Sequence, residues 1–164
     1  MFLYGTSSWH EKSWVGPFYP EGMRSPDWLS HYATQFSTVE VDSTYYGTPK
    51  PATVDNWRAR TPDGFVMCVK FPRGIVHGGD TARPDADVAL VLDKVGKKRD
   101  AFLDVIGRLG DRCGPLVMQF PYFSGDARSC GAGLGPGALS PQVVAHRVCV
   151  LLERGVAGQQ HLVR

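Results

Sequence analysis

The 164-residue sequence predicts an α/β fold, because strand-like and helix-like segments alternate along its first three quarters. Residues 39–42 alternate valine with an acidic residue, which is the period-two pattern of a strand. Residues 25–36 begin with Ser-Pro-Asp, a good helix start, and continue with apolar residues at helical spacing. A strand, a helix and a second strand make a βαβ unit, and its crossover makes the two strands parallel.

The remaining elements repeat this alternation. In chain order we expect a short strand at 2–4, a helix at 25–36, strands at 39–42, 65–71 and 116–120, a short helix from 51 to before 62, and helices at 85–95 and 98–109. Residues 72–80 are rich in glycine and predict a loop. Aromatic residues crowd the loop around residues 9–19, either as a lid that packs over the sheet or as a surface that stacks on a ligand.

The pattern ends after Phe123. Residues 124–141 hold five glycines and almost no periodic apolar residues, so they have little to pack with. We therefore expect two parts, an ordered domain at 1–123 and a poorly ordered tail at 124–164 with a short helix at 143–153.

Composition restricts the function classes. The chain is 43% apolar and 21% charged with a net charge of +2, which suits one globular domain but gives no basic surface for nucleic acid. The four cysteines form no metal or redox pair, no apolar run is long enough to span a membrane, and no signal peptide pattern opens the chain. These observations predict a cytoplasmic protein.

Polar residues at the ends of the predicted strands form the candidate site. Asp42, Lys70 and Gln119 follow three strands, at the edge where parallel α/β folds bind ligands. Strand alternation places Glu40 on the face of Asp42. Glu40 or Asp42 would serve as general base, Lys70 as the cation for a phosphate or oxyanion, and His77 as acid, base or metal ligand. Trp9 and Tyr45 would form the walls.

Structural explanations stay open for the same residues. Glu40 and Lys70 would also make a buried ion pair between neighbouring strands, and His77 would be an ordinary loop histidine. A metal site of Glu40, Asp42 and His77 remains an alternative, but no helical histidine spacing supports it. The sequence contains no P-loop, dinucleotide fingerprint or nucleophile elbow, so it names no cofactor.

Several spaced motifs resemble the DUF72 (YecE-like) family. They are Gly5-Thr-Ser-Ser-Trp9, Trp14-Val-Gly-Pro-Phe-Tyr-Pro20, Val39-Glu-Val-Asp-Ser-Thr-Tyr-Tyr46, Phe65 to Lys70, His77, and Leu116-Val-Met-Gln-Phe-Pro121. The resemblance implies a TIM-barrel-like fold, of which this chain would supply about the first four βα units, and implies no established activity. Ser8 stands where the family usually has glycine, Asp42 where it usually has asparagine, and Val76 where it usually has threonine. The extra charge of Asp42 would favour a cation.

The resemblance ends near residue 123. The codons that encode residues 154–161, read one base later, are compatible with a family-like peptide, so we hypothesise a frameshift near codon 124. We expect a truncated, inactive fragment of a protein whose intact fold binds a small or phosphate-bearing ligand. The alternatives are a hydrolase-like, metal-assisted enzyme completed by dimerisation, and a nucleic-acid-binding module. The exposed edges of a partial barrel would favour self-association.

Overall fold

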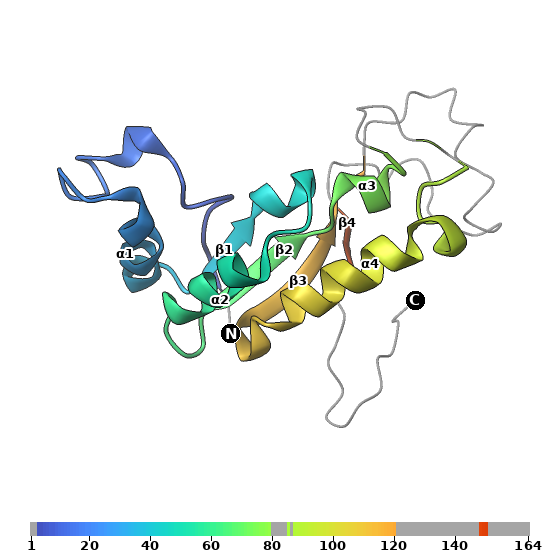
Figure 1. The fold of residues 1–164 in the computed structure, drawn as a ribbon. Helices are drawn as coiled ribbons and strands as arrows, with labels where there is room; N and C mark the ends of the chain where they lie inside the picture. The colour runs from blue at the N-terminus through green and yellow to red at the C-terminus, as the bar shows by residue number, and fades with distance from the viewer. Residues whose placement is uncertain (1–2, 80–84, 86, 121–147, 151–164) are drawn as a thin grey trace.

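The computed structural model describes residues 3–79, 85, 87–120 and 148–150. Its helices and strands alternate, as Figure 1 shows. They are α1 (Trp28–Gln35), β1 (Thr38–Val41), α2 (Pro51–Ala59), β2 (Val66–Lys70), α3 (Arg73–Val76), α4 (Leu92–Gly107), β3 (Cys113–Met118) and β4 (Val148–Val150). Short 3₁₀ turns lie between them, at η1 (Lys12–Trp14), η2 (Ser25–Asp27), η3 (Asp42–Tyr46) and η4 (Gly110–Arg112).

The strands form one sheet in the order β1-β2-β3-β4. The first three run parallel, and β4 pairs antiparallel with β3. The segment at residues 6–8 lies along the free side of β1, since the Ser8 N–H donates to the Glu40 carbonyl at 2.8 Å and the Glu40 N–H donates to the Thr6 carbonyl at 3.0 Å. The predicted α/β fold with a parallel sheet is confirmed, and the carboxyl ends of its three parallel strands meet at one edge.

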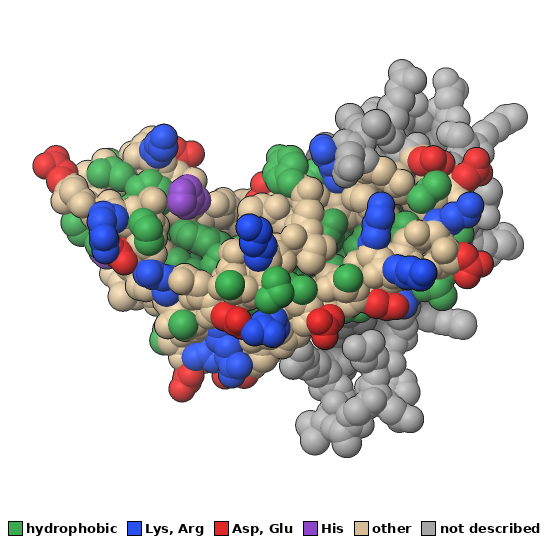
Figure 2. Space-filling model, viewed as in Figure 1, with side chains coloured by type: hydrophobic (Ala, Val, Ile, Leu, Met, Phe, Trp, Pro, Cys, Tyr) green, Lys and Arg blue, Asp and Glu red, His purple; other side chains and the backbone are tan. Residues whose placement is uncertain are grey.

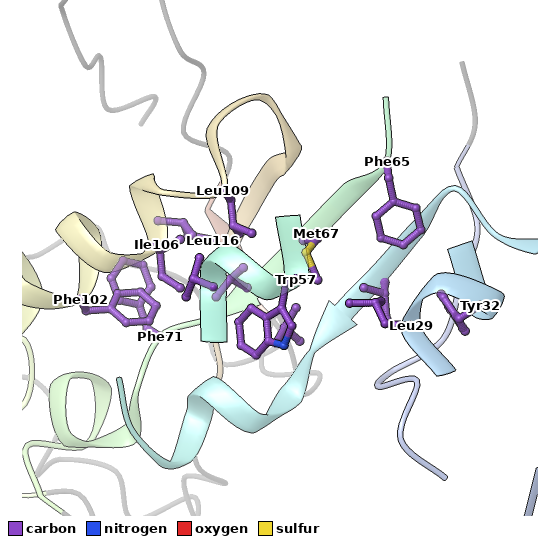
Figure 3. Packing of buried hydrophobic residues seen from close by; sticks show 14 of the residues in the cluster. Leu29, Tyr32, Trp57, Phe65, Met67, Phe71, Phe102, Ile106, Leu109 and Leu116 are labelled. Atoms are coloured by element: carbon purple, nitrogen blue, oxygen red, sulfur yellow. The ribbon is translucent and has the colours of Figure 1, made fainter. Parts of the chain in front are cut away.

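One face of the sheet packs against helices. Val39, Val41, Met67 and Val69 point to this face and are fully or almost fully buried. Figure 3 shows Trp57 from α2 beside Met67, with Phe71, Phe102, Ile106, Leu109 and Leu116 on one side and Leu29, Tyr32 and Phe65 on the other. The strict alternation of buried and half-buried residues in β1 fits a strand with one face in the core.

The opposite face of β1 and β2 is more polar. Thr38, Glu40 and Cys68 alternate with the buried valines and Met67 and are only half-buried. The Thr38 hydroxyl lies 3.8 Å from the Cys68 sulfur, and Glu40 is in register with Cys68 on the neighbouring strand. In a closed barrel this face would point to the interior.

The aromatic residues of the first loop pack on α1. Tyr19 is fully buried and its ring stacks on Trp28 at a centroid distance of 4.9 Å, while its hydroxyl donates to the Trp9 carbonyl. Phe18 contacts Tyr32 and Phe36 of the α1 region. These contacts favour the lid over the stacking surface that the sequence also allowed.

Four segments differ from the sequence-based prediction. Leu3 and Tyr4 are not a strand, and pairing with β1 is reduced to one bridge at Ser7. In place of the two helices predicted at 85–95 and 98–109, one helix, α4, runs without a break from Leu92 to Gly107, and residues 87–90 before it form a turn. The predicted loop 72–80 contains α3.

The fourth difference lies in the tail. A strand stands at Val148–Val150, where the sequence predicted a helix over 143–153, because these residues pair with Leu116–Met118. The other residues of the predicted tail, 124–147 and 151–164, lie outside the described residues.

No helix in the described ranges is long and apolar enough to cross a membrane.

Candidate functional site

A buried lysine with two carboxylates lies at the carboxyl edge of the sheet. Lys70 is the last residue of β2 and is 3% exposed. Its Nζ lies 3.0 Å from Glu40 Oε1 and also donates to Asp42 Oδ1. The three charges therefore meet at the ends of β1 and β2, as the period-two pattern of residues 39–42 predicts. We call Glu40, Asp42 and Lys70 the charged triad.

The charged triad keeps Lys70 protonated. Burial by itself would lower the pKa of Lys70, but hydrogen bonds and charges from Asp42 and Glu40 outweigh that effect and raise the pKa above its ordinary value. Lys70 is thus a cation and hydrogen-bond donor, and a poor nucleophile or base at neutral pH. An ammonium has three N–H donors, and these two carboxylates use two of them.

Two neighbouring residues hold the charged triad in place. The Ser7 hydroxyl donates to Glu40 Oε1 at 2.9 Å, and the Thr44 hydroxyl donates to the carbonyls of Val41 and Lys70 at 2.9 and 2.7 Å. Thr44 is buried within η3, so it fixes the turn that carries Asp42 onto the end of β2. Neither Ser7 nor Thr44 is among the predicted site residues, although the Thr44 hydroxyl follows the predicted strand at the edge where a site is expected. Hydroxyl residues beside a strand end were the only available signal.

Ser8 adopts a backbone conformation that glycine reaches at lower cost. Ser8 has φ of +70°, in the left-handed region that L-residues adopt at a cost. Its hydroxyl accepts a hydrogen bond from the His10 N–H at 3.1 Å, and its carbonyl accepts one from the Thr6 hydroxyl. The bend at Ser8 turns the chain away from β1 directly after Ser7 has reached Glu40.

His77 forms a second cluster, between η3 and the end of β3. It is 2% exposed and follows α3, and its Nε2 lies 3.2 Å from the Gln119 carbonyl oxygen and 3.4 Å from the Tyr45 hydroxyl. A carbonyl only accepts, so we assign the hydrogen to Nε2. Within the described part of the chain, Nδ1 is buried and has no hydrogen-bond partner.

The structure thus divides the predicted site residues into two groups. Glu40, Asp42 and Lys70 contact one another, and His77 contacts Tyr45. Gln119 reaches His77 through its backbone carbonyl. Trp9 packs edge-on against Trp57 at 5.8 Å, on the helix-covered side of the sheet. The catalytic and wall roles given to these residues remain predictions.

A metal centre finds no support in the described ranges, where no three histidine, cysteine or acidic side chains converge. The position between Glu40 and Asp42 is taken by the Lys70 ammonium. The positive partner of Asp42 in this structure is therefore a lysine of the same chain.

A cleft of about 460 Å³ lies at the opposite end of the sheet. Arg112 lines it, with ion pairs to Asp63 at 2.6 Å and Asp111 at 2.7 Å and a hydrogen bond to the Thr61 carbonyl. These residues precede β2 and β3, so the cleft is at the amino ends of the strands. Because residues at that end of βα folds serve stability, we assign the cleft to the ion pairs that join α2, η4 and the loop before β2.

Comparisons with known proteins agree on one family. The model of the family "Protein of unknown function DUF72" matches residues 3–132. The UPF0759 protein YecE of Escherichia coli K12 is 39% identical over 121 residues, and the same holds for that of strain O157:H7. That match covers 74% of this chain and 38% of the relative, so the chain spans less than half of the relative's length. A solved DUF72 family protein of Enterococcus faecalis V583 has a TM-score of 0.50 at 23% identity, covering 69% of this chain and 37% of that protein.

Proposed function

The chain belongs to the DUF72 family of proteins of unknown function, and we propose that the carboxyl edge of its sheet is part of a small-molecule site for a polar, phosphate-bearing ligand. The observation that carries the proposal is the buried ammonium of Lys70 at a strand end, with two of its three donors engaged by Glu40 and Asp42. Because Glu40 and Asp42 fix the orientation of the ammonium, they also fix the direction of the third N–H, which suits an oxygen atom of a ligand.

Charge decides how such a ligand binds. The charged triad carries two carboxylates and one ammonium, so its net charge is −1 while both acids are ionised. A bare anion is repelled by this arrangement, whereas a hydroxyl group accepts from Lys70 and donates to Glu40. The charged triad therefore suits the neutral, hydroxyl-bearing part of the ligand, and its phosphate requires positive charge elsewhere.

Catalysis by the intact fold is the finer part of the proposal. Glu40 is half-buried, accepts from Ser7 and Lys70, and is the candidate general base, while the protonated Lys70 would stabilise developing negative charge. We further propose that the protein is cytoplasmic.

Self-association is the second candidate. Among the described residues, the outer edge of β1 is paired only through residues 6–8, so a second copy would find strand backbone to pair with along this edge. Light scattering after size-exclusion chromatography tests this: a discrete dimer supports it, and a monomer with a cooperative melt contradicts it.

A nucleic-acid-binding role has less support. Figure 2 shows Lys and Arg side chains interspersed with Asp and Glu over the visible face, and several of these arginines are paired with acids. Salt-dependent retention on DNA would revive it.

The ligand proposal is tested by binding measurements on the 164-residue chain and its variants. A panel of sugar phosphates and matched unphosphorylated polyols is screened by thermal shift and confirmed by saturation-transfer NMR. Lys70→Arg keeps the charge but moves the donors, so it should abolish binding of the hits while the protein stays folded. Lys97→Met is the control, because Lys97 is exposed on α4 and its loss should leave binding unchanged. Binding that survives Lys70→Arg contradicts the proposal.

A further inference from the structure

Two buried polar nitrogens, one at the start of α3 and one at its C-cap, have no partner in the described part of the chain. They are Arg73 Nε and His77 Nδ1. Buried polar atoms in proteins are almost always hydrogen-bonded, because an unmade bond costs the desolvation of the group. Two such atoms one helical turn apart therefore call for an explanation that a single one would not.

The two residues lie on the same side of α3. They are four positions apart, and the His77 N–H donates to the Arg73 carbonyl at 2.6 Å, which closes one turn of helix. Both pack against the consecutive tyrosines of η3. The Arg73 guanidinium lies 5.8 Å from the ring centre of Tyr46, and the His77 ring meets Tyr45 edge-on at 5.8 Å. The rings of Tyr45 and Tyr46 are 5.4 Å apart, so the four residues are contiguous.

The four residues of the cluster differ in exposure. Tyr46 is 66% exposed and Arg73 is half-buried, whereas His77 is enclosed. Tyr46 and Arg73 thus form the solvent-facing part of the cluster, and the His77 imidazole lies below the surface. The Gly78 carbon has no room for a side chain beside Ala89, so the backbone on the far side of His77 is closely packed.

From this juxtaposition we propose that Arg73 and His77 form a phosphate subsite, with Tyr45 and Tyr46 as its walls. Arg73 is the positive charge that the charged triad does not supply, and a guanidinium is well suited to phosphate oxygens. Because His77 Nε2 donates to the Gln119 carbonyl, Nδ1 is the acceptor nitrogen and would accept a hydrogen bond from the P–OH of a monoprotonated phosphate. The subsite rests on the proposed function, since it places the phosphate of the same ligand whose hydroxyls meet Lys70.

η3 connects the subsite to the charged triad. Asp42 at its first residue bonds Lys70, and Tyr45 and Tyr46 at its end contact His77 and Arg73. Thr44 between them is tied to the Lys70 carbonyl. A ligand that spans η3 thus has its hydroxyls at one end and its phosphate at the other.

The test uses the 164-residue chain with inorganic phosphate and phenyl phosphate as probes, and chloride at equal ionic strength as the reference. Both probes should raise the melting temperature with a saturable dependence on concentration. Arg73→Gln should weaken the binding of both by about tenfold to a hundredfold, the equivalent of one charge-assisted hydrogen bond. Arg24→Gln removes the same charge from an exposed position and should leave binding unchanged.

A direct readout keeps the proposal testable if Arg73→Gln does not fold. Phosphate should shift the ¹⁵N resonance of His77 Nδ1 in the unmodified chain and leave His10 unchanged, and Arg73→Lys should reduce the affinity while the charge stays. Stabilisation no greater than in chloride, or equal affinity in Arg73→Gln and the unmodified chain, overturns the subsite. If phosphate binding is lost in Lys70→Arg but kept in Arg73→Gln, only the subsite is overturned. If polyols bind Lys70→Arg as well as they bind the unmodified chain, the proposed function is overturned.

Discussion

Replacing Lys70 by methionine tests whether the charged triad is held together as its geometry indicates. Methionine keeps most of the apolar stem and removes the ammonium, so Glu40 and Asp42 are left beside each other without a counter-charge. Removing one partner of a buried ion pair costs about 3–5 kcal/mol. Asp42 is 40% exposed and regains water, whereas Glu40 is 16% exposed and does not, so we expect a loss of about 2–3 kcal/mol.

Urea denaturation at neutral pH measures this loss as a decrease in the transition midpoint of about 1–2 M. Lys97→Met, on the exposed face of α4, is the matched control and should change the midpoint little. The triple variant Glu40→Gln, Asp42→Asn, Lys70→Met removes the unpaired charges as well and should recover most of the stability. If Lys70→Met is as stable as Lys97→Met, the charged triad contributes no net stabilisation and the reasoning is wrong.

The pH dependence of the stability difference between the unmodified chain and Lys70→Met provides an independent check. Because Asp42 and Glu40 raise the pKa of Lys70 in the folded state, Lys70 contributes stability that is fully present below the ordinary value of 10.5 and is lost as the pH rises through the folded-state pKa. The unmodified chain should therefore lose its advantage over Lys70→Met at alkaline pH. A difference that is constant across pH would exclude an electrostatic origin.

Three further predictions follow from the packing around the first loop. Burial, with a smaller effect of Tyr32, raises the pKa of Tyr19 to about 12, so the stability of the fold should fall between pH 10 and 12. Tyr19→Phe should flatten that part of the pH profile. Absorbance at 295 nm measures the ionisation of tyrosine, and circular dichroism measures unfolding. Gly5→Ala should destabilise the fold by about 1–3 kcal/mol in urea, because a Cβ at Gly5 would lie 2.0 Å from the Thr38 carbonyl oxygen. Ser8→Gly should raise the urea midpoint slightly, by about 0.5 kcal/mol, since relief of the positive φ exceeds the entropy that glycine adds to the unfolded chain; a decrease would mean that the bond to His10 matters more.

The strands and the charged triad were accessible from the sequence because both depend on short-range periodicity. Alternation over residues 39–42 placed Glu40 and Asp42 on one side, and parallel pairing with the strand ending at Lys70 brought the opposite charge to them. Asp42 is the first residue of η3 and not part of β1. It follows β1 directly, and its carboxylate still accepts a hydrogen bond from Lys70.

The second cluster was not accessible in the same way. Tyr45 and His77 are 32 residues apart, and their contact depends on how η3 and α3 fold back over the sheet edge. Pro72 and Gly74 indicated a loop, so the four-residue spacing of Arg73 and His77 carried no meaning until α3 was known to be helical. The helix predicted for the tail is wrong for a related reason. Val148–Val150 pair with β3, which is distant in the sequence, and this pairing overrides the local helical spacing.

The two clusters have complementary charge, and this restricts the ligand more than either does alone. The charged triad is net negative and saturates two of the three donors of its lysine, so it discriminates against anions and selects for hydroxyl groups. Arg73 begins α3 and His77 follows it. In the described ranges, no acidic side chain forms an ion pair with either residue. A neutral polyol would engage the first cluster only, and inorganic phosphate the second only. A phosphorylated hydroxyl compound would engage both across η3, so its affinity should exceed that of either part, and the gain should disappear when Thr44, which ties η3 to β2, is replaced by valine.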